Sequence, residues 1–286
     1  MGSGTAVCRS ISDFRFSISH CDMKAVINEI DLAYDDVGQG QPVLFVHAFP
    51  LNRTMWAPQV SALVERCRCV AADLRGFGES SLHGSATIAQ YADDLASLMD
   101  HLRIEQAVVV GCSMGGYTAL AMWRQHSDRV RGLVLADTRA GADTPEGKER
   151  RRQLIVVANE EGSLGVANVQ IPSLVGKTTR EKQPDTYDAV HRMMAQAKPA
   201  AIVGGIEAMM TRPDSTPLLS TITVPTLIVV GEEDVPTPVK ESLAMHAAIP
   251  GSRLQVIAQA GHLSNMEKPA AFNHVLTEFL GTLSYT

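Results

Sequence analysis

Short apolar runs alternate with amphipathic segments along most of the chain. Residues 42–47 are almost continuously apolar, which is typical of a strand that is covered on both faces. In residues 87–102 the apolar positions instead repeat at helical spacing. Regular alternation of these two patterns predicts parallel strands joined by helical crossovers.

The pattern predicts eight strands, of which the last six are parallel. The first two would form an opening antiparallel pair. The expected strands are residues 25–30, 31–37, 42–47, 68–72, 107–110, 130–136, 226–230 and 254–257. The expected helices are residues 56–66, 87–102, 114–126, 239–248 and 270–283. The predicted fold class is therefore α/β, an eight-stranded and mostly parallel sheet with helices on both faces.

Residues 138–223 interrupt the alternation. They contain no clear strand, and they are too many for a loop. Thr144-Pro145-Glu146 is a typical helix start. We expect a small helical insertion within a core formed by residues 23–137 and 224–286. Residues 1–22 lack the pattern, and we expect an N-terminal extension with little structural role.

Composition narrows the classes of function. The chain has 31 acidic and 25 basic residues, so its formal net charge of −6 argues against a nucleic-acid partner. No apolar run reaches the roughly 18 residues that a membrane span needs. The five cysteines follow no disulfide or metal-site pattern, which favours reduced thiols in a cytoplasmic protein. No metal or cofactor is expected.

Gly111-Cys112-Ser113-Met114-Gly115 matches the pattern G-x-S-x-G between a predicted strand and a predicted helix. A serine on such a sharp turn has a strained backbone, and glycines on either side remove steric collisions. Ser113 would also lie at a helix N-terminus, where free amides stabilise negative charge. Ser113 is therefore the candidate nucleophile.

A serine nucleophile needs a base, and the base needs an orienting carboxylate. After such a turn, the acid and then the histidine follow along the sequence. His262 follows the last predicted strand and is the best placed of the nine histidines. Asp234 is the favoured acid, with Asp137 in reserve. Glu232 and Glu233 are further competitors beside Asp234.

An oxyanion requires two preorganised donors. The amide of Met114, directly after the nucleophile, is the first candidate. The amide of Phe49, in the loop after residues 42–47, is the second, because Pro50 has no N–H. His47 is either a second base or, as we favour, a brace for this loop.

Taken together, these motifs resemble those of the α/β-hydrolase superfamily. The segments that carry the resemblance span most of the chain from Met23. They are His47-Ala48-Phe49-Pro50, Asp73-Leu74-Arg75-Gly76-Phe77-Gly78-Glu79-Ser80, Gly111–Gly116, Gly231–Asp234 and Gly261-His262. The closest similarity is to bacterial arylesterases, non-haem perhydrolases, 3-oxoadipate enol-lactonases and esterase-type acyl-homoserine lactonases. One departure is Ala48, where these proteins usually have glycine.

The resemblance implies a serine hydrolase of carboxylic esters or lactones, such as an N-acyl homoserine lactonase or esterase. It also implies that residues 138–223 form a cap over the active site, and we use that name below. The alternatives are a perhydrolase or a carbon–carbon hydrolase or lyase with the same triad, and a ligand receptor without turnover. The expected partner is a small-molecule ester or lactone, with a second copy of the chain as a candidate homodimer partner.

Five further residues are candidates for the substrate pocket. The cap contributes four methionines, Met193, Met194, Met209 and Met210. Methionine is adaptable, so these side chains either form an acyl-chain pocket or pack the cap against the core. Trp56 either lines the pocket or anchors its own helix.

Overall fold

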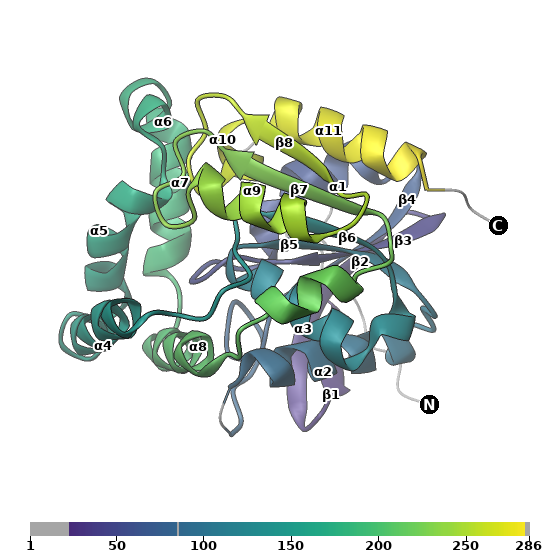
Figure 1. The fold of residues 1–286 in the computed structure, drawn as a ribbon. Coiled ribbons are helices and arrows are strands. Elements are labelled where there is room, and N and C mark those ends of the chain that lie inside the picture. Colours follow the sequence, from purple (N-terminus) through teal and green to yellow (C-terminus); the bar gives the residue numbers. More distant parts are fainter. Residues whose placement is uncertain (1–22, 85, 284–286) are drawn as a thin grey trace.

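The computed structural model describes residues 23–84 and 86–283. Its centre is one eight-stranded sheet, whose place between the helices can be followed in Figure 1. The strand order is β1-β2-β4-β3-β5-β6-β7-β8. The strands are β1 (Met23–Ile27), β2 (Ile30–Val37), β3 (Gln41–Val46), β4 (Cys67–Ala72), β5 (Ala107–Cys112), β6 (Val130–Ala136), β7 (Thr226–Gly231) and β8 (Arg253–Ile257). β1 and β2 pair antiparallel, and the six strands from β3 onward are mutually parallel. The predicted fold class is confirmed.

Two predicted boundaries were wrong at the start of the chain. The strand expected over residues 25–30 ends at Ile27, because Asn28 and Glu29 both have positive φ angles (45° and 67°) and form a two-residue hairpin turn. The helix expected over residues 56–66 is divided into the short helix η1 (Arg53–Trp56) and α1 (Ala57–Leu63), which carries a proline in its first turn.

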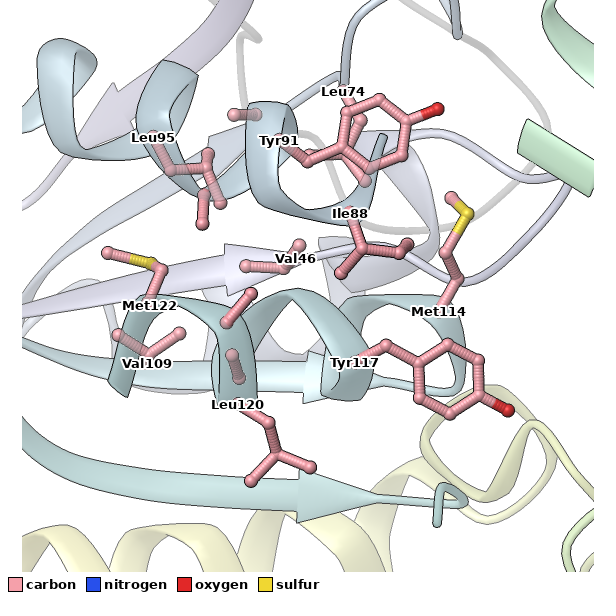
Figure 2. Packing of buried hydrophobic residues seen from close by; sticks show 14 of the residues in the cluster. Val46, Leu74, Ile88, Tyr91, Leu95, Val109, Met114, Tyr117, Leu120 and Met122 are labelled. Carbon is pink, nitrogen blue, oxygen red and sulfur yellow. The ribbon is translucent and has the colours of Figure 1, made fainter. Parts of the chain in front are cut away.

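Helices cover both faces of the sheet, and alternate residues of each strand point to opposite faces. In β5, Val109 packs on one side with α2 (Ile88–His101) and α3 (Met114–Gln125). Val108 and Val110 pack on the other side with α1 and α11 (Pro269–Gly281). Figure 2 shows part of the first of these layers, with Leu95 of α2 and Met122 of α3 among the residues of one apolar cluster. α9 (Val239–Ala248) covers β7 on the same side as α3.

The cap is helical and lies beside the carboxyl ends of the parallel strands (Figure 1). Its helices are α4 (Pro145–Glu160), α5 (Gly162–Leu174), α6 (Lys177–Lys182), α7 (Pro184–Ala195), α8 (Pro199–Thr211) and η3 (Thr216–Thr221). Its two connections to the core meet, because the amide of Ser215 donates to the carbonyl oxygen of Ala140 at 3.0 Å. Beside this pair, Arg212 forms an ion pair with Asp143 at 3.0 Å. The two connections are thus held together at one place, which we call the hinge (residues 139–143 and 211–215).

The remaining elements complete the core. They are η2 (Ser127–Arg129) before β6 and α10 (Ser264–Glu267) between β8 and α11. In the part of the chain that the structure describes, no helix is both long enough and apolar enough to cross a lipid bilayer. The predicted N-terminal extension, residues 1–22, lies outside the described residues.

Candidate active site

Ser113 occupies a strained turn between β5 and α3. Its backbone angles are φ 53° and ψ −112°, which a residue with a side chain rarely adopts. Close packing requires the flanking glycines. A Cβ atom on Gly111 would lie 2.2 Å from the carbonyl oxygen of Gly115, and one on Gly115 would lie 2.1 Å from that of Val46. The sequence motif therefore forms the sharp turn that it predicts.

Ser113, His262 and Asp234 are brought together, although 149 positions separate the serine from the histidine. His262 Nε2 lies 2.8 Å from Ser113 Oγ. On the other side of the ring, His262 Nδ1 lies 3.0 Å from Oδ1 and 2.9 Å from Oδ2 of Asp234. With the proton on Nδ1, the imidazole donates to the carboxylate and accepts from the serine hydroxyl. This is the geometry in which a histidine can withdraw the serine proton.

Asp234 is held by the turn that carries it. The amide of Thr237 donates to Asp234 Oδ1 at 2.8 Å, and the Thr237 hydroxyl donates to Oδ2 at 2.8 Å. Of the competing acids, Glu232 accepts from the amide of Gln259, and Glu233 accepts from the amide of Thr178. Neither of these hydrogen bonds involves His262. Sequence reasoning missed Thr237, for which no motif offered a signal.

Several carboxylates stabilise the charged form of His262. Burial lowers its pKa, but the charge and hydrogen bond of Asp234 and the charges of Asp137 and Glu267 outweigh burial, so the pKa lies above its ordinary value of 6.5. The imidazolium that forms when the serine proton is transferred is therefore stabilised within the site. Ser113 itself is 8% exposed, at the edge of the sheet beside which the cap lies.

The two predicted oxyanion donors lie on adjacent segments. α3 starts at Met114, and its first turn packs against the end of β3 at Val46 and His47. The loop with Phe49 continues directly from there. Within residues 23–84 and 86–283, neither the Met114 nor the Phe49 amide donates a hydrogen bond to another backbone group. Met114 is the first residue of α3, so its amide has no acceptor within that helix, and both amides remain the candidates for the oxyanion hole.

His47 lies fully buried beneath this loop, and both of its ring nitrogens are engaged. Nδ1 lies 2.9 Å from the carbonyl oxygen of Ala48, and Nε2 accepts from the amide of Leu74 at 3.0 Å. Burial lowers the pKa of His47, against the charge of Asp73 and the hydrogen bond to Ala48. A neutral ring with both nitrogens engaged matches a brace rather than a second base.

The predicted pocket methionines pack between the cap and the core. Met209 and Met210 belong to the apolar cluster that contains Phe49 and Met114. Met193 and Met194 belong to the second cluster, and the Met193 Sδ atom lies 4.0 Å from Thr54 Oγ1. The cap therefore contributes methionines to both apolar clusters of the core.

Trp56 is fully buried in the core. Its ring lies 5.3 Å from that of Phe45 and 6.1 Å from that of Phe272, measured between ring centroids. This packing joins η1 to β3 and α11. Of the two roles considered for Trp56, these contacts favour that of an anchor for its own helix.

A second attachment of the cap lies beside the triad. Residues 174–178, which we call the strap, connect α5 to α6. The amide of His262 donates to the carbonyl oxygen of Leu174 at 2.9 Å, and Glu267 accepts from the amide of Gly176 at 2.9 Å. Glu233 accepts from Thr178, as described above. The acid and histidine loops are therefore both tied to the cap. Sequence reasoning missed Glu267, although it lies only five residues after His262.

Known proteins are similar to this chain in sequence and fold over nearly its whole length. The family model that describes the alpha/beta hydrolase fold matches residues 41–269. An esterase from Thermogutta terrifontis superposes with a TM-score of 0.89 at 41% identity, covering 92% of this chain and 99% of that chain. The 3-oxoadipate enol-lactonase 2 of Acinetobacter baylyi is 29% identical over 251 residues, which are 87% of this chain and 92% of that protein. Est816, described as an N-acyl homoserine lactone degrading enzyme, superposes with a TM-score of 0.78 at 26% identity, covering 90% of this chain and 100% of that chain.

Proposed function

Because this chain belongs to the α/β-hydrolase fold family, we propose that it is a serine hydrolase that cleaves carboxylic esters or lactones. One observation carries the proposal: the continuous hydrogen-bonded series from Asp234 through His262 to Ser113. The esterase and enol-lactonase relatives support the same class of reaction. The proposed activity requires no metal or cofactor.

In the proposed mechanism, Ser113 Oγ attacks the carbonyl carbon while His262 Nε2 takes its proton. The Phe49 and Met114 amides stabilise the oxyanion. His262 then gives the proton to the leaving alkoxide, and the ester bond breaks to leave an acyl-enzyme. Water, deprotonated by His262, attacks this intermediate and releases the acid and free Ser113. Asp234 stays ionised and keeps the imidazole oriented.

Open-chain esters and lactones differ only in where the alkoxide goes. With a lactone the alkoxide remains tethered to the acyl group, so hydrolysis gives a single ring-opened acid. The relatives described as an enol-lactonase and as an N-acyl homoserine lactone degrading enzyme support a lactone substrate. The esterase at 41% identity supports an open-chain ester. If the cap methionines line the pocket rather than only pack the cap against the core, medium-length acyl groups should fit, because methionine adapts to varied apolar shapes.

The direct test compares turnover of p-nitrophenyl butyrate and of an N-acyl homoserine lactone by the wild type and Ser113→Ala. We expect Ser113→Ala to lose turnover of whichever substrate the wild type hydrolyses. The matched control is Ser127→Ala, which removes an exposed hydroxyl on η2 and should retain full activity. The ratio of the two kcat/KM values then assigns the substrate class.

Two outcomes would contradict the proposal. Full activity in Ser113→Ala would remove the serine from the reaction. A wild type that is acylated once by the p-nitrophenyl ester and then stalls would match a receptor instead. Burst kinetics with substoichiometric and with excess ester distinguish a hydrolase, which continues to turn over after the first acylation, from a receptor, which stops there.

A further inference from the structure

Three consecutive residues contact the three segments that carry the candidate triad. They are Ala136, which ends β6, and Asp137 and Thr138, which follow it directly. The first and third hold the backbone of the serine. Ser113 N–H donates to the carbonyl oxygen of Ala136 at 2.9 Å, and the Thr138 hydroxyl donates to the carbonyl oxygen of Ser113 at 2.8 Å. The end of β6 therefore supports the strained turn directly.

The middle residue, Asp137, holds the other two loops. Its Oδ1 accepts from the amide of Gly231 at 2.8 Å. Gly231 ends β7, and its carbonyl oxygen accepts from the amide of Asp234 at 3.2 Å. Asp137 Oδ2 accepts from both the amide (3.0 Å) and the hydroxyl (2.6 Å) of Ser264, two residues after His262. One carboxyl group thus joins the acid turn to the histidine loop.

Asp137 holds this place at an energetic cost. It is fully buried, and its φ angle of 46° is unusual for a residue with a side chain. Burial and the nearby charge of Asp234 raise its pKa to about 8, against the opposing effects of His262, Ser264 and Gly231. A buried carboxyl group beside a second carboxylate weakens the fold, and such groups concentrate at functional sites.

We propose that Asp137 is a positioning residue, which holds the Asp234 turn and the His262 loop in register with Ser113. This inference rests on the proposed serine-hydrolase function. Asp137 does not touch the reacting atoms. It acts on His262 through Ser264 and on Asp234 through Gly231, so its removal should displace the base and the acid together.

The test measures kcat and KM for Asp137→Ala, Ser264→Ala and the double variant on the substrate that the wild type hydrolyses. We expect Asp137→Ala to lower kcat about 100-fold with KM little changed, because small displacements of reacting groups cost about that much. The double variant should be no worse than Asp137→Ala alone, since Ser264 acts through the same contact. Asp128→Ala, which removes an exposed carboxylate, is the matched control.

The pH profile separates positioning from a merely structural role. Asp137 shares its surroundings with Asp234 and His262, with the Cys112 thiol of β5, and with Glu267 of α10. The wild-type profile of kcat/KM should contain an ionisation near pH 8 that Asp137→Asn lacks. The amide oxygen introduced by Asp137→Asn would still accept from Gly231, so this variant also serves if Asp137→Ala does not fold.

Three results would overturn the inference. They are an unchanged kcat in folded Asp137→Ala, additive losses in the double variant, and identical pH profiles for the wild type and Asp137→Asn. Loss of activity in Ser113→Ala with any of these results would leave the serine-hydrolase function intact and remove only the role of Asp137. Retention of activity in Ser113→Ala would instead remove the proposed function itself.

Discussion

The amide of His262 donates a 2.9 Å hydrogen bond to the carbonyl oxygen of Leu174, the last residue of cap helix α5. The candidate base is therefore fastened by its backbone to the cap. Glu267 and Glu233 add two further hydrogen bonds to the strap, and the hinge is a separate attachment of the cap. Movement of the cap at the strap would disturb the histidine loop as well as the access of substrate.

Gly176→Ala should lower kcat about 10-fold and destabilise the fold by about 1–3 kcal/mol. A Cβ atom there would lie 2.7 Å from the amide nitrogen of Gly261, directly before His262. The added methyl group must push the strap away from the histidine loop. Kinetics and thermal melting test this. Gly141→Ala is the control, because its Cβ would meet no atom within 4 Å; equal behaviour of the two variants would contradict the coupling.

The acid limb of the pH–activity profile should lie above pH 6.5. A base must be neutral to accept the serine proton, and the pKa of His262 is raised, so kcat/KM should fall as pH decreases through that raised value. The charge of Glu267 contributes to the shift, so Glu267→Gln should move the limb to lower pH. Glu149→Gln, an exposed change on α4, should leave it in place. A wild-type limb below pH 6.5 would speak against this electrostatic balance.

Asp143→Asn at the hinge should destabilise the protein by about 3–5 kcal/mol, the usual cost of breaking a buried ion pair. Asp143 pairs with Arg139, Arg151 and Arg212, and its loss would leave the buried Arg212 guanidinium without this counter-charge. Urea unfolding would measure the loss. By comparison, Glu149→Gln breaks an exposed pair with Arg152 and should cost no more than about 1 kcal/mol.

The same hinge pair has a defined pH dependence. Burial raises the pKa of Asp143, but the hydrogen bonds and charges of Arg151 and Arg212 outweigh burial and hold it below the ordinary 3.8. Because the folded-state pKa is depressed, this stabilisation is present above pH 3.8 and is lost as pH falls through the folded-state value. The difference between the wild type and Asp143→Asn should therefore be constant from about pH 7 to about pH 5. A difference that already shrinks in that range would contradict the assignment.

His47→Ala should lower kcat about 100-fold without moving the acid limb of the pH profile. It leaves the amide of Leu74 and the carbonyl oxygen of Ala48 without their partner and loosens the loop that carries the Phe49 amide. Loss of one oxyanion donor costs about this much or more. His274→Ala, on the exposed face of α11, is the control. A shifted limb in His47→Ala would instead favour the second-base interpretation.

The sequence was sufficient for those parts of the site that depend on local sterics or on chain order. The glycines at 111 and 115 are needed by the turn itself, as the close approach of Gly115 to Val46 demonstrates. His262 and Asp234 could be chosen because each follows a predicted strand, and parallel strands end at one edge of the sheet.

Contacts between segments that are distant in the sequence could not be predicted from local sterics or chain order. Asp137 reaches Gly231 and Ser264 across 94 and 127 positions, so its carboxyl group was considered only as a reserve acid. Trp56 was ambiguous for the same reason, because Phe272 lies more than two hundred positions away along the chain. The hairpin boundary at Ile27 was missed because positive φ angles at Asn28 and Glu29 leave no clear mark in composition.

The meeting of Ala140 and Ser215 at the hinge has an evolutionary consequence. The chain leaves the sheet and returns to it at nearly one point, so β6 and β7 are direct neighbours in the sheet although the whole cap lies between them in the sequence. Each doubling of the length of such an insertion costs only about 0.6 kcal/mol in loop-closure entropy. Descendants of this chain can therefore lengthen or shorten the cap helices and acquire new substrates, as long as a strap still meets the histidine loop where Leu174 and Gly176 do here.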